Sequence, residues 1–275
     1  MCSFFRIFVM IFSCLDTKLR NKTTIMKFII RAIPNTITLL NLLSGCIAIV
    51  FALRGWTEFA VYCIFAAAVF DFCDGLSARL LKAYSDLGKQ LDSLSDLVSF
   101  GVAPAMLLHV KLQSLLGNKF TGSFDNGLAW ELLAFVPFII ALFSALRLAK
   151  FNIDTRQTVS FVGLPVPANA LLIASLISLS VYGNCFVAFL DNWIAVIILS
   201  VVMSFLLVCN LPMFALKFVN LTWKANKTRF IFLLISLAIA VFSFIFGENI
   251  MFVVALIIAF YILFSFLLFL FRRAV

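Results

Sequence analysis

Residues 71–96, DFCDGLSARLLKAYSDLGKQLDSLSD, hold five of the twelve acidic residues in this 275-residue chain. They follow directly on the apolar run VYCIFAAAVF at 61–70. A carboxylate inside a membrane span costs at least about 2.5–3.5 kcal/mol on insertion scales, and neighbouring carboxylates repel one another. We therefore interpret this cluster as a functional site that binds positive charge.

The spacing of these residues fits two opposed helical faces. At 100° per residue, one helix places a set of residues within an arc of about 140°. That set is Asp71, Asp74, Gly75, Ala78, Arg79 and Lys82. A second helix places Gly88, Asp92, Asp96 and Ser99 within about 100°. The short connector AYSDL predicts a hairpin with these faces opposed, and it leaves Asp86 as a solvated loop residue.

Oxygen ligands without His or Cys suit Mg²⁺, Mn²⁺ or Ca²⁺. Two divalent cations would neutralise four aspartates, and such a pair is suited to clamping phosphoryl oxygens during in-line displacement. Gly75, Ala78 and Gly88 leave room for a group close to the backbone, and Arg79 and Lys82 add positive charge on the same face. The glycines would otherwise be interpreted as helix-packing residues.

The elements that carry these residues are membrane helices. The chain is 64% apolar and 12% charged, whereas soluble domains are about 45–50% apolar and about 25% charged. Apolar runs predict an all-α, polytopic bundle of about eight transmembrane helices with a six-helix catalytic core. The predicted helices are centred on 33–53, 57–78, 90–110, 129–150, 164–184, 190–213, 229–246 and 250–271. The last two contain no residue that indicates chemistry, so we expect them to be lipid-facing scaffold or an oligomer contact.

The basic residues predict the orientation. One set of segments holds 17 of the 21 Lys and Arg residues, while the alternating set holds Arg54, Lys111 and Lys119. This asymmetry places both termini and the Asp-rich segment on the cytoplasmic side of the inner membrane. The net charge of +9 is thus explained by topology, and no nucleic-acid partner is expected.

The motif Asp71-x2-Asp74-Gly75-x2-Ala78-Arg79-x8-Gly88-x3-Asp92-x3-Asp96 resembles the complete signature of the CDP-alcohol phosphatidyltransferases. The flanking segments are similar to the phosphatidylserine synthase branch of that family. These segments are IPNTITLLNLLSG at 33–45, GKQLDSLSDLVSFGVAPA at 88–105, RLAKFN at 147–152 and GLPVPANA at 163–170. We expect an N-terminal extension without assigned function at 1–25, the enzyme domain at 26–215, and a basic loop with two helices at 216–275.

The resemblance implies a role for each motif residue. Asp71, Asp74, Asp92 and Asp96 would bind two divalent cations, Mg²⁺ or Mn²⁺, and Asp96 would also be the general base. Gly75, Ala78, Arg79 and Gly88 would contact CDP-diacylglycerol, with Lys82 nearby. The acceptor would be L-serine, the products phosphatidylserine and CMP, and the enzyme a homodimer.

Four further residues are weaker candidates. Asn35 and Thr38, together with Asn41, are spaced to share one helical face. They would either line the nucleotide or phosphate site or hydrogen-bond to neighbouring helices. Arg147 would either meet the serine carboxylate or a lipid phosphate, or extend to the membrane interface. Arg156 is a similar candidate.

Two alternative functions remain open at this point. The first keeps the fold but uses another acceptor, glycerol 3-phosphate or inositol. The second is a divalent-cation transporter with an intramembrane aspartate site. A transporter predicts acids midway through several spans, whereas here they gather at one mouth beside Arg79 and Lys82.

Overall fold

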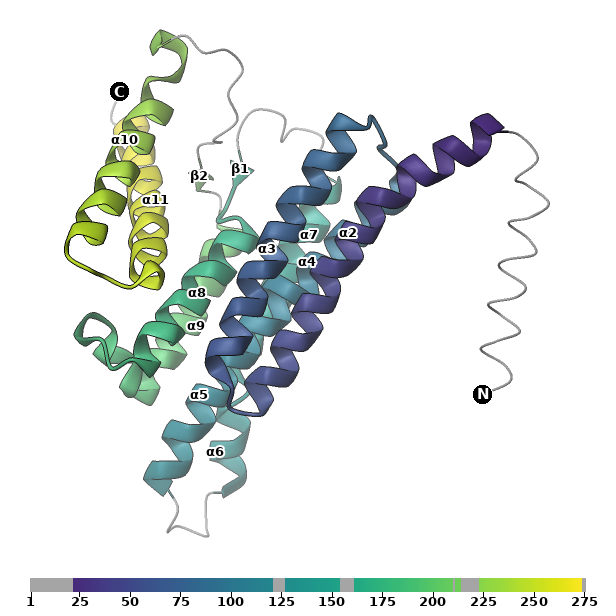
Figure 1. Ribbon diagram of the computed structural model, residues 1–275. Coiled ribbons are helices and arrows are strands. Elements are labelled where there is room, and N and C mark those ends of the chain that lie inside the picture. The colour runs from purple at the N-terminus through teal and green to yellow at the C-terminus, as the bar shows by residue number, and fades with distance from the viewer. Residues whose placement is uncertain (1–21, 121–126, 154–160, 210, 214–222, 274–275) are drawn as a thin grey trace, which may run out of the picture.

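The computed structural model describes residues 22–120, 127–153, 161–209, 211–213 and 223–273 (Figure 1). Within these ranges the chain is almost entirely helical, with one short antiparallel strand pair. The helices are α2 (Lys22–Leu53), α3 (Thr57–Leu80), α4 (Asp86–Asp96), α5 (Ala103–Phe120), α6 (Gly127–Leu133), α7 (Ile139–Ile153), α8 (Val166–Val181), α9 (Trp193–Val208), α10 (Trp223–Ile245) and α11 (Ile250–Arg273). The strands are β1 (Phe161–Val162) and β2 (Pro212–Met213), with Phe161 opposite Met213.

All eight predicted apolar segments form helices, which confirms a polytopic helical membrane protein. Six are long and apolar enough to cross a membrane: Ala32–Leu53, Thr57–Leu80, Asp86–Gly117, Trp130–Ile153, Asn226–Ile245 and Ile250–Leu270. Helix α8 bends by 95° into the 3₁₀ segment Cys185–Asp191, and α9 spans only Trp193–Val208. These two helices are therefore shorter than the full spans expected of them.

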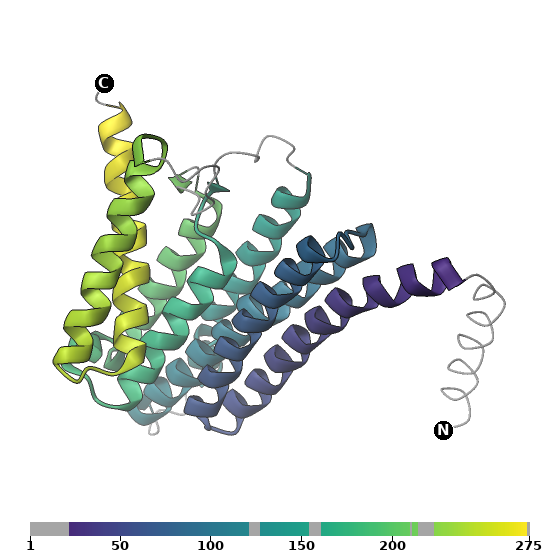
Figure 2. The ribbon, with the colours of Figure 1, turned by 45° about the horizontal axis from the view of Figure 1, so that its top comes forward.

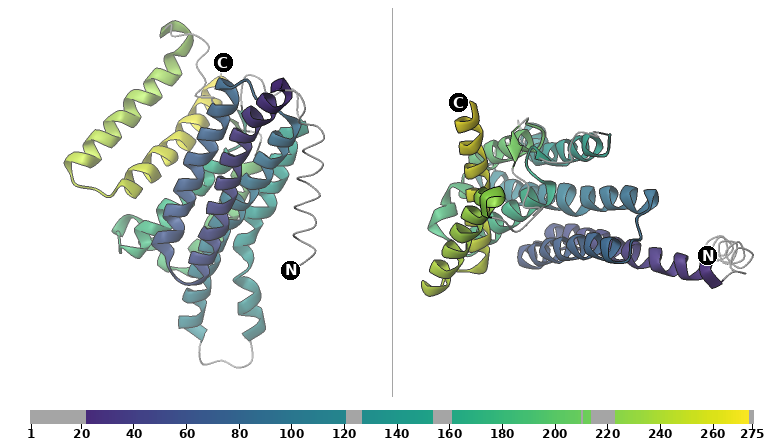
Figure 3. Two further views of the ribbon diagram at one scale, coloured as in Figure 1. Left: turned by 45° about the vertical axis from the view of Figure 1, so that its right-hand side comes forward. Right: turned by 90° about the horizontal axis from the view of Figure 1, so that it is seen from above.

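The bundle has the α2–α3 hairpin along one side and the α10–α11 pair at the opposite edge (Figure 2). The view from above shows the α10–α11 pair at one end of the remaining helices, apart from the α2–α3 hairpin (Figure 3). Buried apolar side chains from α2, α3, α5, α8 and α9 form one continuous core. A smaller cluster joins Leu164, Met213, Phe232 and Tyr261, so the last two helices are fixed to the rest.

The third predicted span is one long helix that changes type in its middle. A π-helical segment, Leu97–Val102, lies between α4 and α5 and directly follows Asp96. One wider turn shifts the helical register, so side chains before and after it face different neighbours. Such segments are frequent at functional sites, and here the segment separates the Asp-rich half from the apolar half.

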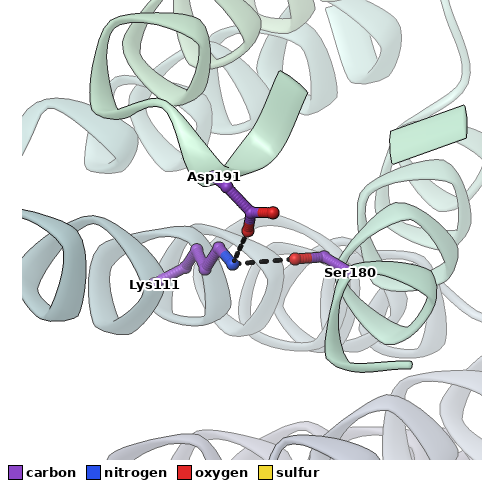
Figure 4. Close-up of polar contacts among 3 residues, drawn as sticks. All are labelled: Lys111, Ser180 and Asp191. Atoms are coloured by element: carbon purple, nitrogen blue, oxygen red, sulfur yellow. Dashed lines mark hydrogen bonds and ion pairs between the residues drawn. The ribbon is translucent and has the colours of Figure 1, made fainter. Parts of the chain in front are cut away.

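At the end away from the Asp-rich segment, Lys111 joins three elements (Figure 4). Its Nζ donates to Ser180 Oγ of α8 at 2.8 Å and to Asp191 Oδ1 of the 3₁₀ segment at 2.9 Å. Lys111 is one of the three basic residues that the charge pattern assigns to the opposite side of the membrane. Its ammonium group is thereby neutralised at the bend after α8.

His109 shows a second polar contact in this half of the bundle. Its side chain is 9% exposed, its Nδ1 lies 2.6 Å from the Ala134 carbonyl oxygen, and its ring stacks on Phe135. The neighbouring carbonyl supplies the partner that allows the ring to be buried.

Helix α2 approaches the π-helical segment very closely at Gly45. A Cβ built there would lie 2.4 Å from Ser99 Oγ and 2.7 Å from Ser99 Cα. We expect Gly45→Ala to destabilise the protein by about 1–3 kcal/mol, because the backbone of one helix must move. Thermal unfolding in detergent would measure the loss.

Gly117→Ala is the matched control, because a Cβ at Gly117 in α5 meets no atom within 4 Å. The thermal unfolding midpoint of Gly117→Ala should equal or exceed that of the wild type, since alanine favours a helix by about 1 kcal/mol over glycine. Equal midpoints for the two variants would contradict the close approach at Gly45.

Candidate active site

Helix α3 carries Asp71 and Asp74 on its last three turns. The two residues are three apart and therefore lie on the same side of the helix. Asp74 is only 5% exposed, and Asp71 is half-buried. Helix α2 packs along the length of α3, so the carboxylates lie between helices instead of facing lipid.

Helix α4 begins one residue after Ser85, which acts as its N-cap. Ser85 Oγ accepts a hydrogen bond from the Gly88 backbone N–H at 3.0 Å. Asp86 therefore occupies the first helical turn, where a carboxylate is favourable. Asp86 was predicted to be a solvated loop residue. It is exposed as predicted, but the prediction of a loop was wrong because Asp86 belongs to α4. The cap also sets the register that points Asp92 and Asp96 inward.

Three of the four predicted carboxylates meet at one point. Ligand oxygens of Asp71, Asp74 and Asp92 all lie within 4.8 Å of one another. Asp74 Oδ2 is buried without a hydrogen-bond partner among the described residues. Carboxylates this close repel each other, and an orphaned buried oxygen is costly. The donor set fits a hard divalent cation, which would offset the repulsion between the carboxylates and give the buried Asp74 oxygen a partner.

Asp96 lies one helical turn deeper than Asp92 and has a different environment. It is 8% exposed, its carboxyl group lies within hydrogen-bonding reach of Asp71, and Asn41 Nδ2 donates to its Oδ1 at 3.3 Å. Asn41 is itself held in place, because Ser99 Oγ donates to the Asn41 carbonyl oxygen at 2.9 Å. Asp96 is thus oriented by α2 and adjoins the three-carboxylate cluster.

A cavity of about 240 Å³ opens beside the carboxylates, between α2, α3 and α4. Six predicted residues line it together with Asp74 and Asp92: Asn35, Thr38, Gly75, Ala78, Arg79 and Gly88. A Cβ at Gly75 would meet nothing within 4 Å, so that side of α3 faces open space. The cavity lining therefore combines two carboxylates with an open glycine surface and the basic side chains of Arg79 and Lys89.

Asn35 and Thr38 both agree with the first alternative left open by the sequence, and Thr38 also agrees with the second. They line the cavity, and the Thr38 hydroxyl also donates to the Pro34 carbonyl at 3.0 Å and lies within reach of Asp74. A Cβ at Gly88 would lie 3.0 Å from Asn35 Oδ1. Gly88 therefore allows α2 and α4 to approach each other at the cavity.

Lys82 does not share the helical face of the aspartates. Helix α3 ends at Leu80, and Lys82 has a left-handed backbone with φ of 50°. The Ala83 N–H donates to the Ala78 carbonyl at 2.9 Å and closes this helix end. Lys82 is exposed and does not line the cavity, so the prediction that placed it on this face was wrong.

Sequence reasoning missed three residues at the cavity rim: Tyr84, Ser85 and Lys89. Lys89 Nζ also donates to the Asn152 carbonyl at 3.3 Å, and Asn152 Nδ2 donates to Ser93 Oγ at 2.8 Å. These bonds join α4 to the end of α7. The contacts of these residues are with parts of the chain far away in sequence, so the contacts could not be predicted. The signal that could have found the residues is their position within or next to the motif.

Arg147 on α7 is partly buried, and its Nε is buried without a hydrogen-bond partner among the described residues. Helix α7 packs against the π-helical segment that directly follows Asp96. Arg156 lies outside the residues that the structure describes.

The carboxylate cluster predicts specific cation binding. Asp92→Asn should weaken Mn²⁺ binding at least about tenfold, because it removes one of three converging charged ligands. Titration of purified protein, with free Mn²⁺ followed by electron paramagnetic resonance, would measure this. Asp86→Asn on the exposed first turn of the same helix should bind as the wild type does, and equal weakening by both changes would contradict the site.

Comparison with known proteins assigns the chain to a family. The model for CDP-alcohol phosphatidyltransferase matches residues 31–206, which include the carboxylates and the cavity. A Mycobacterium bovis protein named CDP-diacylglycerol–serine O-phosphatidyltransferase is 34% identical over 195 residues, which cover 67% of this chain and 61% of that protein.

Two further relatives agree. The Bacillus subtilis protein of the same name is 38% identical over 139 residues, covering 49% of this chain and 69% of the relative. An archaetidylserine synthase from Methanothermobacter thermautotrophicus is 32% identical over 182 residues, covering 66% and 71%. The chain thus spans about three fifths of the length of the mycobacterial relative. Since the family model covers more than half of the sequence, this chain belongs to the CDP-alcohol phosphatidyltransferase family.

Proposed function

We propose that this protein transfers a phosphatidyl group from CDP-diacylglycerol to L-serine, which yields phosphatidylserine and CMP. The observation that carries the proposal is the convergence of Asp71, Asp74 and Asp92 beside a cavity at a membrane-helix end. Serine as acceptor is supported by the names of the relatives from Mycobacterium bovis and Bacillus subtilis.

In this proposal the three clustered aspartates bind divalent cations, Mg²⁺ or Mn²⁺, and Asp96 completes the set. Bound there, the cations would neutralise pyrophosphate oxygens and make CMP a better leaving group. The open wall at Gly75 and Ala78 leaves room for the nucleotide portion, with Gly88 opposite. Arg79 at the rim is placed to offer its guanidinium to a phosphate.

The chemical step requires a base for the acceptor hydroxyl. Its oxygen attacks the phosphorus that carries diacylglycerol, the bond from that phosphorus to the CMP oxygen breaks, and the hydroxyl proton passes to the Asp96 carboxylate. A serine hydroxyl is a weak nucleophile, so a carboxylate within reach is needed. The hydrogen bond from Asn41 to Oδ1 helps to orient the Asp96 carboxylate for this task.

The location of the site suits a lipid donor. The aspartates lie near the ends of α3 and α4, so acyl chains can stay in the bilayer while the nucleotide reaches water. We assign this end to the cytoplasm, with both termini on the same side, because the basic residues gather there.

Release of CMP from CDP-diacylglycerol by purified protein, with Mg²⁺ or Mn²⁺, tests the function. L-serine, glycerol 3-phosphate and inositol should be supplied in parallel. We expect release with serine alone, and a loss of at least about a hundredfold in Asp96→Asn, because a positioned base contributes about 10²–10⁴ in rate. Asp86→Asn serves as the matched control and should retain activity.

The outcomes separate the alternatives. Release with another acceptor would retain the transferase reaction and refute serine as the acceptor. If CMP is released with none of the acceptors, and vesicles that contain the protein take up Mn²⁺, the protein is a transporter and the transferase proposal is refuted. Equal activity of Asp96→Asn and the wild type would refute the role of Asp96 as the general base.

A variant of Gly75 tests whether this glycine contacts the substrate or serves helix packing. Gly75→Ala should raise the KM for CDP-diacylglycerol about tenfold, since the added methyl enters the cavity space, while the unfolding midpoint stays unchanged. Initial rates at varied donor concentration would measure the KM. A lowered midpoint with an unchanged KM would instead assign Gly75 to helix packing.

A further inference from the structure

Asn41 of α2 is fully buried, yet only one half of its carboxamide has a partner. Its exposed fraction is 0%, its Nδ2 donates to Asp96 Oδ1 at 3.3 Å, and its Oδ1 has no hydrogen-bond partner among the described residues. A carboxylate only accepts hydrogen bonds, so the nitrogen of Asn41 must face Asp96 and the oxygen is left for another donor. A buried oxygen without a donor is costly, so this atom is suited to a donor that a ligand brings.

Helices α2 and α4 run parallel beside the cavity. Asn35 and Gly88 both line it, and a Cβ at Gly88 would lie 3.0 Å from Asn35 Oδ1. About two turns further along both helices, Asn41 bonds to Asp96. Asp96 also lies one turn beyond Asp92, which lines the cavity. Asn41 Oδ1 and the Asp96 carboxylate are therefore neighbours in the bundle interior, one turn beyond the cavity lining.

These two neighbouring groups match two neighbouring groups of an amino acid that carries a hydroxyl. In L-serine the carbon that bears the hydroxyl is bonded to the carbon that bears the ammonium. When the hydroxyl meets Asp96, the ammonium lies close to the side chain next to Asp96, which is Asn41. A hydrogen bond from a charged donor is roughly twice as strong as a neutral one, so this oxygen favours an ammonium over a second hydroxyl.

We propose that Asn41 Oδ1 accepts a hydrogen bond from the ammonium group of the acceptor and thereby makes the enzyme prefer an amino acid to other alcohols. This inference rests on the proposed function, because it assigns a residue to the acceptor of that reaction. The carboxamide then has two tasks. Its Nδ2 orients the Asp96 carboxylate, and its Oδ1 binds the acceptor.

A comparison of two acceptors separates these tasks. L-serine and 3-hydroxypropanoate share the hydroxyl and the carboxylate, and only L-serine carries an ammonium. We expect the wild type to release CMP with a kcat/KM at least about tenfold higher for L-serine, since a hydrogen bond to a charged group contributes that factor or more. Initial rates at varied acceptor concentration and saturating CDP-diacylglycerol would measure both values.

Asn41→Leu removes both amide groups at similar volume. The preference for L-serine should fall to about twofold or less, because the lost contact concerns only the ammonium. If Asn41 merely orients Asp96, both kcat/KM values fall by the same factor and the preference stays, which would overturn the proposal. Both rates come from one protein sample, so a misfolded fraction lowers them alike and leaves their ratio unchanged.

Asn41→Asp is the second variant, because it keeps the shape and an acceptor oxygen while it replaces the nitrogen. It should retain the preference for L-serine although both rates fall, and loss of the preference would contradict the assignment to Oδ1. If either variant releases no CMP, calorimetric titration with L-serine in the presence of CMP and Mn²⁺ makes the comparison without turnover. An unchanged Kd in Asn41→Leu would then refute the contact.

Thr36→Val is the matched control on the same helix. Thr36 is exposed, and its hydroxyl donates to the Ala32 carbonyl of its own helix at 2.8 Å. Its rates with both acceptors should equal those of the wild type. A lowered preference for L-serine in this control would show that any change in α2 has the same effect, and it would overturn the specific role of Asn41.

The wild-type measurement separates this inference from the proposed function. If the wild type releases no CMP with L-serine, the proposed acceptor is refuted and this inference with it. If the wild type uses L-serine and 3-hydroxypropanoate equally well, the transfer to serine stands and only the role of Asn41 is refuted.

Discussion

The cost of grouping carboxylates inside an apolar bundle constrains the rest of this structure. Asp71, Asp74 and Asp92 converge within 4.8 Å, with Asp96 directly below them. Without positive charge such a group would be strongly unfavourable. The surrounding helices reflect this constraint, since the cluster lies near helix ends, α2 supplies amides and hydroxyls in place of apolar side chains, and Arg79 lines the adjoining cavity.

Helical periodicity predicted the part of the site that is local in sequence. The spacing of Asp71, Asp74 and Asp92 was sufficient because each residue lies within a regular helix. The prediction for Lys82 was wrong because α3 ends at Leu80 and Lys82 itself has a left-handed backbone. The bonds that join Lys89 and Ser93 to Asn152 could not be predicted, because they depend on how α7 packs against α4, far away in the sequence.

The close contact between α2 and the π-helical segment links packing to chemistry. Gly45 allows the helices to approach, Ser99 bonds to the Asn41 carbonyl, and Asn41 bonds to Asp96. Each step depends on the previous one, so the orientation of the candidate base depends on a glycine that contacts no substrate. Apolar packing and site geometry are therefore coupled along this line of residues.

The two halves of the site differ in how far apart their residues lie along the chain. The cluster of Asp71, Asp74 and Asp92 belongs to a single helical hairpin, whose loop is short and whose closure costs little entropy. Lys89 beside the cavity instead bonds to Asn152 at the end of α7, 63 residues further along the chain. The hairpin can therefore bring its carboxylates together during synthesis before the helix that anchors α4 exists.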